Sequence, residues 1–164
     1  MKPWLKASLI KFWFYGAVYF FVGWGLFLAS GDQLDLIVVL GLAMGAVNDL
    51  AVNRIFRNME TARLEYHPYM MVPAKAFYAF WLNLLYGLAL SILVALFYQF
   101  ANIVIIRLFE LSEESVPLGA EPILYGIVAM LLDIGLVRLF RYALPAFVRK
   151  RREDSAAQSG GGKE

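Results

Sequence analysis

The chain has 164 residues, of which 61% are hydrophobic and 17% charged, and its mean hydropathy is +0.63. A soluble domain averages roughly 45–50% apolar and about 25% charged residues, so the composition predicts a membrane protein, and the length predicts a single domain. There is no cysteine and one histidine, His67, which excludes disulfides, thiolate metal sites and clusters of histidine ligands.

Four apolar segments are each long enough to cross a bilayer as an α-helix, which takes about 20 residues. In chain order, the predicted spans cover residues 12–30, 34–54, 76–98 and 122–140. A cleaved signal peptide is the alternative for the first segment, but its apolar run is too long and too aromatic, and no small-residue cleavage site follows it. The apolar pattern continues over 99–109, which predicts either an extension of the third helix or an amphipathic segment on the outer surface.

Basic residues are distributed unevenly between the two sides of these spans. If the N-terminus lies inside, fourteen of the 15 lysines and arginines fall on the inner side, and Arg107 is the exception. The positive-inside rule therefore predicts that both termini are cytoplasmic, and the pattern favours a bacterial plasma membrane. Residues 1–148 form the predicted helical domain. Residues 149–164 form a basic tail with little to bury, which we expect to be disordered.

Two stretches of the sequence resemble one another. DLAVNRIFR begins at Asp49 and DIGLVRLFR begins at Asp133, and each lies at the cytoplasmic end of an outside-to-inside span. The preceding spans also align, each with a lysine at its start and a glycine twelve residues later (Lys11 and Gly23, Lys75 and Gly87). The sequence therefore predicts an all-α membrane bundle of two helical hairpins related as a parallel repeat. Chance similarity within a small residue alphabet is the alternative.

Small and polar residues recur at every fourth position of the second and third spans, which aligns them along one face of each helix. Because carboxylates inside spans are rare and costly, they mark a candidate intramembrane polar site together with nearby amides and arginines. Its members are Asp49, Asp133, Asn48, Asn53, Asn83, Arg54 and Arg138. Positions that allow close approach of two helices are Gly41, Gly45, Gly87 and Ser91.

Two interpretations of these polar rows stay open. In the first, they are contact surfaces between helices. The carboxylates would then form reciprocal ion pairs (Asp49 with Arg138, Asp133 with Arg54). Alternatively, the arginines would extend to the cytosolic surface of the membrane, and the carboxylates would bond to Asn48 or Asn83. In the second, they form a proton- or cation-linked site in the inner half of the bundle.

The sequence has no P-loop, no dinucleotide-binding glycine motif, no nucleophile elbow and no zincin motif. We therefore expect no enzymatic activity, no cofactor, no metal and no nucleic-acid partner. The leading hypothesis is a multi-pass accessory, scaffold or assembly protein that acts through helix–helix contacts in the lipid bilayer, as a homo-oligomer or with a larger membrane partner. The alternative is a small oligomeric transporter or channel that couples to protons or cations through Asp49 and Asp133.

Overall fold

The computed structural model describes residues 2–25, 33–58, 69–72, 78–109 and 120–151, and these residues form helices and no strand. By length and composition, four of the helices can cross a membrane: Pro3–Gly23, Leu34–Phe56, Ala79–Phe97 and Glu121–Arg151. The prediction of an all-α protein with four membrane-crossing helices is confirmed to this extent.

The first helix begins earlier than the predicted span. Helix α1 covers Pro3–Val18 and continues through a π-helical turn, η1, at Tyr19–Gly23. Pro3 fits the first turn, where its missing N–H leaves no hydrogen bond unmade. The predicted boundary at residue 12 follows Lys11, the last charge before the apolar run. In the structure Lys11 is buried within the helix, so that charge does not end it.

The second membrane-crossing helix contains three consecutive elements. Helix α3 covers Gln33–Val47, the π-helical turn η2 covers Asn48–Val52, and α4 covers Asn53–Asn58. A π-turn adds a residue to one turn of the helix and is frequent at functional sites. Here it falls on the polar stretch that contains Asn48 and Asp49.

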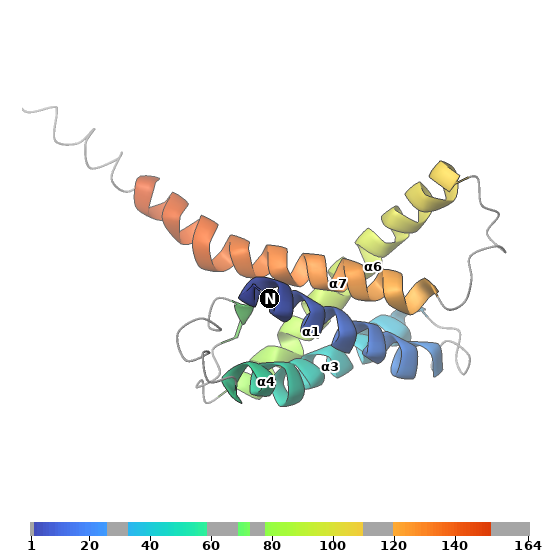
Figure 1. The fold of residues 1–164 in the computed structure, drawn as a ribbon, viewed down its shortest axis with the longest axis horizontal. Helices are drawn as coiled ribbons and strands as arrows, with labels where there is room; N and C mark the ends of the chain where they lie inside the picture. The colour runs from blue at the N-terminus through green and yellow to red at the C-terminus, as the bar shows by residue number, and fades with distance from the viewer. Residues whose placement is uncertain (1, 26–32, 59–68, 73–77, 110–119, 152–164) are drawn as a thin grey trace, which may run out of the picture.

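The third and fourth helices are longer than their predicted spans. Helix α6 covers Ala79–Phe109, so residues 99–109 extend the third helix, and its last part projects away from the bundle (Figure 1). Helix α7 covers Ala120–Arg138 and is followed by the π-helical turn η5 at Leu139–Ala143 and by helical residues 144–151. The first three residues of the predicted disordered tail are therefore helical, and the rest of that tail lies outside the described residues.

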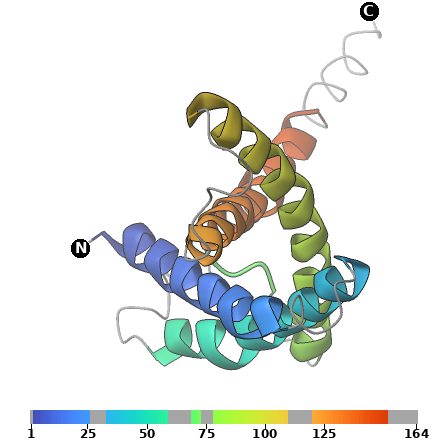
Figure 2. The ribbon, with the colours of Figure 1, turned by 90° about the vertical axis from the view of Figure 1, so that its right-hand side faces the viewer.

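The helices pack in two main pairs. Helix α1 lies along α7, helix α3 lies along α6, and α6 also contacts α7 (Figures 1 and 2). The main buried core lies between these pairs and includes Tyr15, Leu40, Met44, Leu90, Val94, Tyr125 and Ala129. A second cluster, of Ala7, Val52, Phe56 and Met70, packs where α1 begins.

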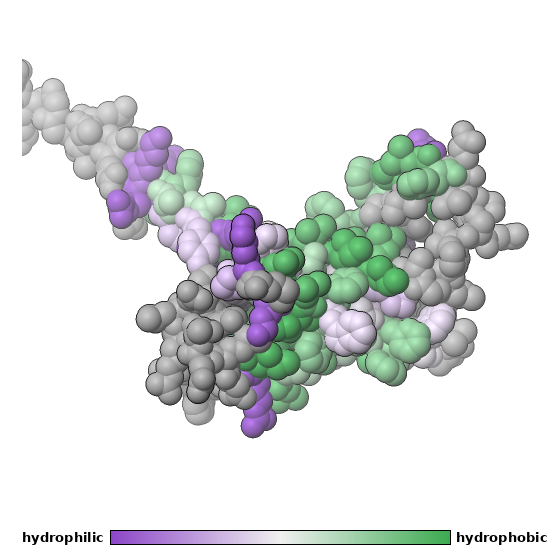
Figure 3. Space-filling view, viewed as in Figure 1, coloured by the Kyte–Doolittle hydropathy of each residue, from purple (hydrophilic) through white to green (hydrophobic). Residues whose placement is uncertain are grey.

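The outer surface of the bundle is largely apolar, as expected of helices that face lipid. Trp13, Phe21 and Leu85 are all exposed there, and apolar residues cover the middle of the visible face in Figure 3. Hydrophilic residues gather at the end where α1 begins. We call this the basic end and define it by the exposed residues Lys2, Lys6, Arg54 and Arg138.

Glycines bring the backbones of α3 and α6 into direct contact. A Cβ atom built on Gly87 would lie 2.5 Å from the backbone nitrogen of Gly45, and one built on Gly41 would lie 2.8 Å from the Cα of Leu88. No side chain fits at such distances. Ser91, one turn beyond Gly87, donates a hydrogen bond of 2.9 Å from Oγ to the Ile37 carbonyl oxygen. The predicted small-residue positions therefore all lie at the α3–α6 contact.

We expect Gly87→Ala to separate α3 from α6 and to lower the free energy of unfolding by about 1–3 kcal/mol, the usual cost of overpacking. The matched control is Gly135→Ala on α7, where the new Cβ atom meets nothing within 4 Å. That variant should be as stable as wild type, or more stable, because alanine favours helix over glycine by about 1 kcal/mol. Thermal unfolding of both variants in detergent measures the difference. Equal stability of the two would contradict the close backbone contact.

Candidate functional site

A buried ion pair joins α1 to α7. Lys11 Nζ lies 2.7 Å from Asp133 Oδ2, and the two side chains are only 2% and 1% exposed. Lys11 Nζ also donates a hydrogen bond of 2.6 Å to the carbonyl oxygen of Tyr69, in the short segment 69–72. The ammonium group therefore links α1 both to α7 and to the chain that precedes α6.

Two tyrosines complete the environment of the Asp133 carboxylate. The Tyr15 hydroxyl donates to Oδ2 at 2.6 Å, and the Tyr86 hydroxyl donates to Oδ1 at 2.5 Å. Tyr15 lies one turn after Lys11, which places both side chains on one face of α1, and Tyr86 comes from α6. Three helices therefore meet at a single carboxylate.

This arrangement compensates for burying a charge. An unpaired carboxylate in a low-dielectric interior is strongly destabilised, whereas a close opposite charge with further hydrogen bonds offsets the loss of water. Asp133 has one cationic and two hydroxyl donors on its two oxygens. The site is thus a satisfied polar network, and removing one member would leave the others buried without partners.

A second polar cluster is centred on Asn83 and joins α6 to η2. Asn83 Nδ2 donates to Asp49 Oδ1 and to the Ala79 carbonyl oxygen, both at 2.9 Å. Asn83 Oδ1 in turn accepts a hydrogen bond of 2.9 Å from Asn48 Nδ2. Asn83 is fully buried, whereas Asp49 is half-buried. One amide therefore binds two consecutive polar residues of the neighbouring helix.

The hypothesis of reciprocal ion pairs is wrong for Asp133. Its partner is Lys11, and both Arg54 and Arg138 are exposed. Asp49 is instead bound by Asn83, as in the alternative interpretation. The hypothesis rested only on the repeat, which contains an aspartate and an arginine in each half, and the structure instead pairs Asp133 with the buried Lys11 of α1.

The remaining predicted site residues are not part of one cluster. Asn53 is 1% exposed, and its Nδ2 has no hydrogen-bond partner within the part of the chain that the structure describes. Arg54 follows it on α4 and is exposed at the basic end. The structure thus brings together Asn48, Asp49 and Asn83 but leaves Asp133 in a separate network.

Three residues of the Asp133 network were missed by sequence reasoning: Lys11, Tyr15 and Tyr86. Lys11 was used as an inner-side charge that fixes topology and as the start of the repeat, but not as a member of the polar site. The available signal was the spacing of four residues between Lys11 and Tyr15, which puts a cation and a hydroxyl donor on the same helix face. Tyr86 follows Asn83 by three residues and shares its face of α6 in the same way.

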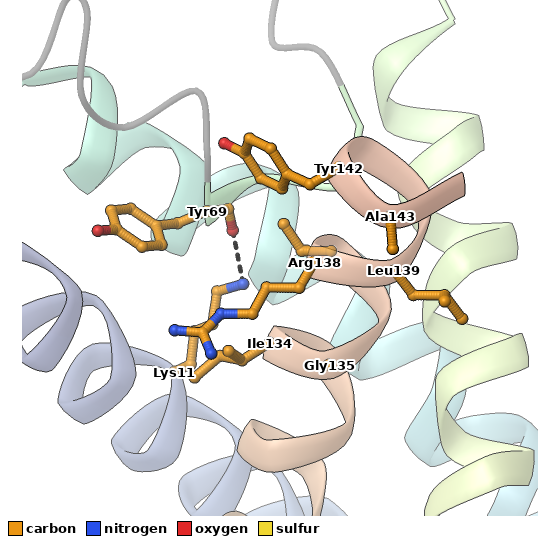
Figure 4. Close-up of a pocket in the computed structure, with 9 residues that line it drawn as sticks. Lys11, Tyr69, Ile134, Gly135, Arg138, Leu139, Tyr142 and Ala143 are labelled. Atoms are coloured by element: carbon orange, nitrogen blue, oxygen red, sulfur yellow. Dashed lines mark hydrogen bonds between the residues drawn. The ribbon is translucent and has the colours of Figure 1, made fainter. Parts of the chain in front are cut away.

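A surface pocket of about 810 Å³ adjoins the ion pair at the basic end. Lys11, Arg138 and Tyr142 lie on its wall, and the Tyr69 carbonyl that Lys11 binds lies at its edge (Figure 4). In the described ranges, no three His, Cys, Asp or Glu side chains gather in a way that would hold a metal ion. The polar side chains that line the pocket are the cationic Lys11 and Arg138 and the hydroxyl groups of Tyr69 and Tyr142.

We expect Asp133→Asn to lower the free energy of unfolding by about 3–5 kcal/mol, because it leaves the Lys11 ammonium as a buried unpaired charge. The control Asp49→Asn should have a much smaller effect, because the amide oxygen of the new side chain still accepts from Asn83 and the position is only half-buried. Thermal unfolding of the detergent-purified variants gives both values.

The double variant Lys11→Met with Asp133→Asn separates the ion pair from other effects. It should be clearly less destabilised than the sum of the two single variants, because neither buried charge is then left alone. Additive losses would mean that the two groups do not interact.

Comparison of the chain with protein-family models, with curated proteins and with solved structures finds no match. What this protein does is therefore inferred from its own residues and their geometry.

Proposed function

We propose that the protein is a non-enzymatic accessory, scaffold or assembly subunit that works through helix–helix contacts in the bilayer. The observation that carries the proposal is that Asp133 and Asn83, two buried polar groups of the bundle, are bonded to side chains of neighbouring helices. Asp133 accepts from Lys11 and two tyrosines, and Asn83 binds two residues of the neighbouring helix. Polar groups that are already bonded across helices hold a bundle together and are not free to carry a solute.

The outer surface supports a role in association with other membrane components. Helix α6 has 31 residues, a length of about 46 Å at 1.5 Å per residue. The hydrocarbon core is about 30 Å thick, so part of α6 extends beyond it. That extension carries exposed apolar residues, Phe100, Leu108 and Phe109. The partners we propose are the lipid bilayer and either further copies of this chain or a larger membrane protein.

One observation favours proton- or cation-coupled transport as a second candidate. Lys11 pairs with Asp133 and also lines the pocket at the basic end. An intramembrane ion pair that borders a surface pocket has the position of a proton-accepting site in a carrier. Four helices enclose little space, so this function would require an oligomer.

We also propose a parallel repeat of two hairpins, with both termini in the cytoplasm of a bacterial cell. The helix pairing supports the repeat. The first hairpin contains α1 and α3, and the second contains α6 and α7. A two-fold rotation that exchanges α1 with α6 and α3 with α7 turns the α3–α6 contact into the α7–α1 contact, and both contacts are present. The polar contacts follow the same relation, because Asp133 of α7 is bound by a residue of α1 and Asp49 of η2 is bound by a residue of α6. The concentration of lysine and arginine on one side supports the orientation.

The two candidate functions differ in proton permeability. Vesicles that contain the purified protein and a pH-sensitive dye should keep an imposed pH gradient as long as protein-free vesicles do, because both oxygens of Asp133 are already bonded to Lys11 and to two tyrosines. The matched sample contains Asp133→Asn, and its vesicles should keep the pH gradient as long as those with wild type. A leak in wild type that Asp133→Asn abolishes, with the protein still folded and inserted, would replace the scaffold proposal by transport.

Reporter fusions test the orientation. Green fluorescent protein fused after Glu164 should fluoresce in a bacterial host, and alkaline phosphatase at the same position should be inactive, because fourteen of the 15 basic residues hold that side in the cytoplasm. The control places both reporters after Arg107, in a chain truncated there, and should give the opposite pattern. Active phosphatase at the C-terminus would contradict the proposed topology.

A further inference from the structure

The pocket at the basic end has walls from three parts of the chain. Lys11 comes from α1, Tyr69 from the segment 69–72, and Arg138 and Tyr142 from α7 and η5 (Figure 4). Among the residues that the structure describes, the lining contains no aspartate or glutamate. Asp133, the ion-pair partner of the lining residue Lys11, is itself 1% exposed. The groups presented to the pocket are therefore hydrogen-bond donors and cations, which select an anion.

The donors have capacity left for a ligand. A lysine ammonium group has three N–H donors, and Lys11 gives one to Asp133 and one to the Tyr69 carbonyl. A buried side chain that lines the pocket thus has a third donor without an acceptor in the described part of the chain. Arg138 is exposed, and within that part of the chain its guanidinium group has no carboxylate partner.

The charges favour a phosphate group over a neutral ligand. Asp133 offsets the charge of Lys11, so Arg138 supplies the net positive charge of the pocket. The planar fork of arginine matches phosphate oxygens, and such charge-assisted bonds are about twice as strong as neutral ones. The Tyr142 hydroxyl is a further hydrogen-bond donor in the lining, in addition to Lys11 and Arg138.

The rest of the pocket is apolar. Ile134, Val137 and Leu139 line it beside the donors, and Leu139 and Phe140 are both 48% exposed on the outer surface of the same helix. A ligand that satisfies both parts has an anionic head and a hydrocarbon tail. Since this is the end of a bundle whose sides are apolar, such an amphiphile has direct access from the bilayer.

Two local features shape the pocket. The π-helical turn η5 supplies Leu139, Tyr142 and Ala143 to its lining, and π-turns often occur at functional sites. Arg141, in the same turn, donates from Nη2 to the Met71 carbonyl oxygen at 3.2 Å. This bond holds the segment 69–72 against η5, so the two sides of the pocket stay together.

We infer that this pocket binds the phosphate group of an anionic phospholipid, with Arg138, Tyr142 and the third N–H of Lys11 on the phosphate oxygens and an acyl chain along Leu139. The proposal goes beyond the scaffold function and does not depend on it. It differs from general attraction of basic residues to a charged membrane, because a single arginine beside a buried lysine provides the selectivity.

The test is the thermal unfolding of detergent-purified protein titrated with phosphatidylglycerol, with phosphatidylcholine and with inorganic phosphate. Wild type should be stabilised by phosphatidylglycerol at concentrations at least about tenfold below those needed for phosphatidylcholine. Arg138→Gln should weaken the phosphatidylglycerol effect at least about tenfold, which is the loss of one charge-assisted hydrogen bond. Arg138→Lys should fall in between, because it keeps the charge but loses the fork.

The matched control is Arg54→Gln, which removes an exposed arginine from the same end of the bundle but outside the pocket. Its response to phosphatidylglycerol should equal that of wild type. An equal loss in Arg54→Gln and Arg138→Gln would overturn the proposal in favour of diffuse attraction between charges. Stabilisation by inorganic phosphate alone, as large as that by phosphatidylglycerol, would overturn the lipid as the source of the phosphate group.

Discussion

Lys11 and Asp133 place opposite charges inside a bundle of membrane-crossing helices, and the arrangement of α1, α6 and α7 depends on how these charges are compensated. Each alone would cost several kcal/mol in such an interior. Together, with the hydroxyls of Tyr15 and Tyr86 and the carbonyl of Tyr69, they form a network with hydrogen bonds on both carboxylate oxygens. Because the donors to the carboxylate come from α1 and α6, it fixes the register of α7 against both helices. Lys11 in turn donates to the Tyr69 carbonyl oxygen and so ties the segment 69–72 to the same network.

The two main helix pairs are held by different means. Between α3 and α6, glycines allow the backbones to touch. One turn before Gly87, Asn83 binds Asn48 and Asp49. Between α1 and α7, the ion pair is accompanied by close backbone approaches at two glycines. A Cβ atom on Gly126 would lie 2.9 Å from the Phe12 carbonyl oxygen, and one on Gly16 would lie 3.1 Å from the Pro122 carbonyl oxygen. In lipid there is no hydrophobic drive between apolar helices, so close packing and polar contacts supply the specificity.

The ion pair also connects the interior of the bundle to the pocket at its basic end. Lys11 belongs to both, because its ammonium group binds Asp133 on one side and lines the pocket on the other. A group bound in the pocket would add an interaction to Lys11 and hence to the network that orients three helices. Lys11 would therefore link occupancy of the pocket to the packing of the bundle, because a ligand that binds the folded state stabilises it.

Hydrophobic run length was sufficient to predict the number of membrane-crossing helices, because about 20 apolar residues can satisfy their backbone groups in lipid only as a helix. The four-residue spacing of Gly41 and Gly45 on one helix, and of Asn83 and Gly87 on the next, likewise marked the faces that meet. Sequence could not assign the partner of Asp133, because a contact between residues 122 positions apart depends on which helices become neighbours. Sequence reasoning also placed the start of α1 too late. It took Lys11 as a charge at the membrane surface, because the carboxylate of Asp133 that compensates this charge comes from another helix. Local spacing determined the elements and their faces, and only the tertiary structure decided which charges compensate one another.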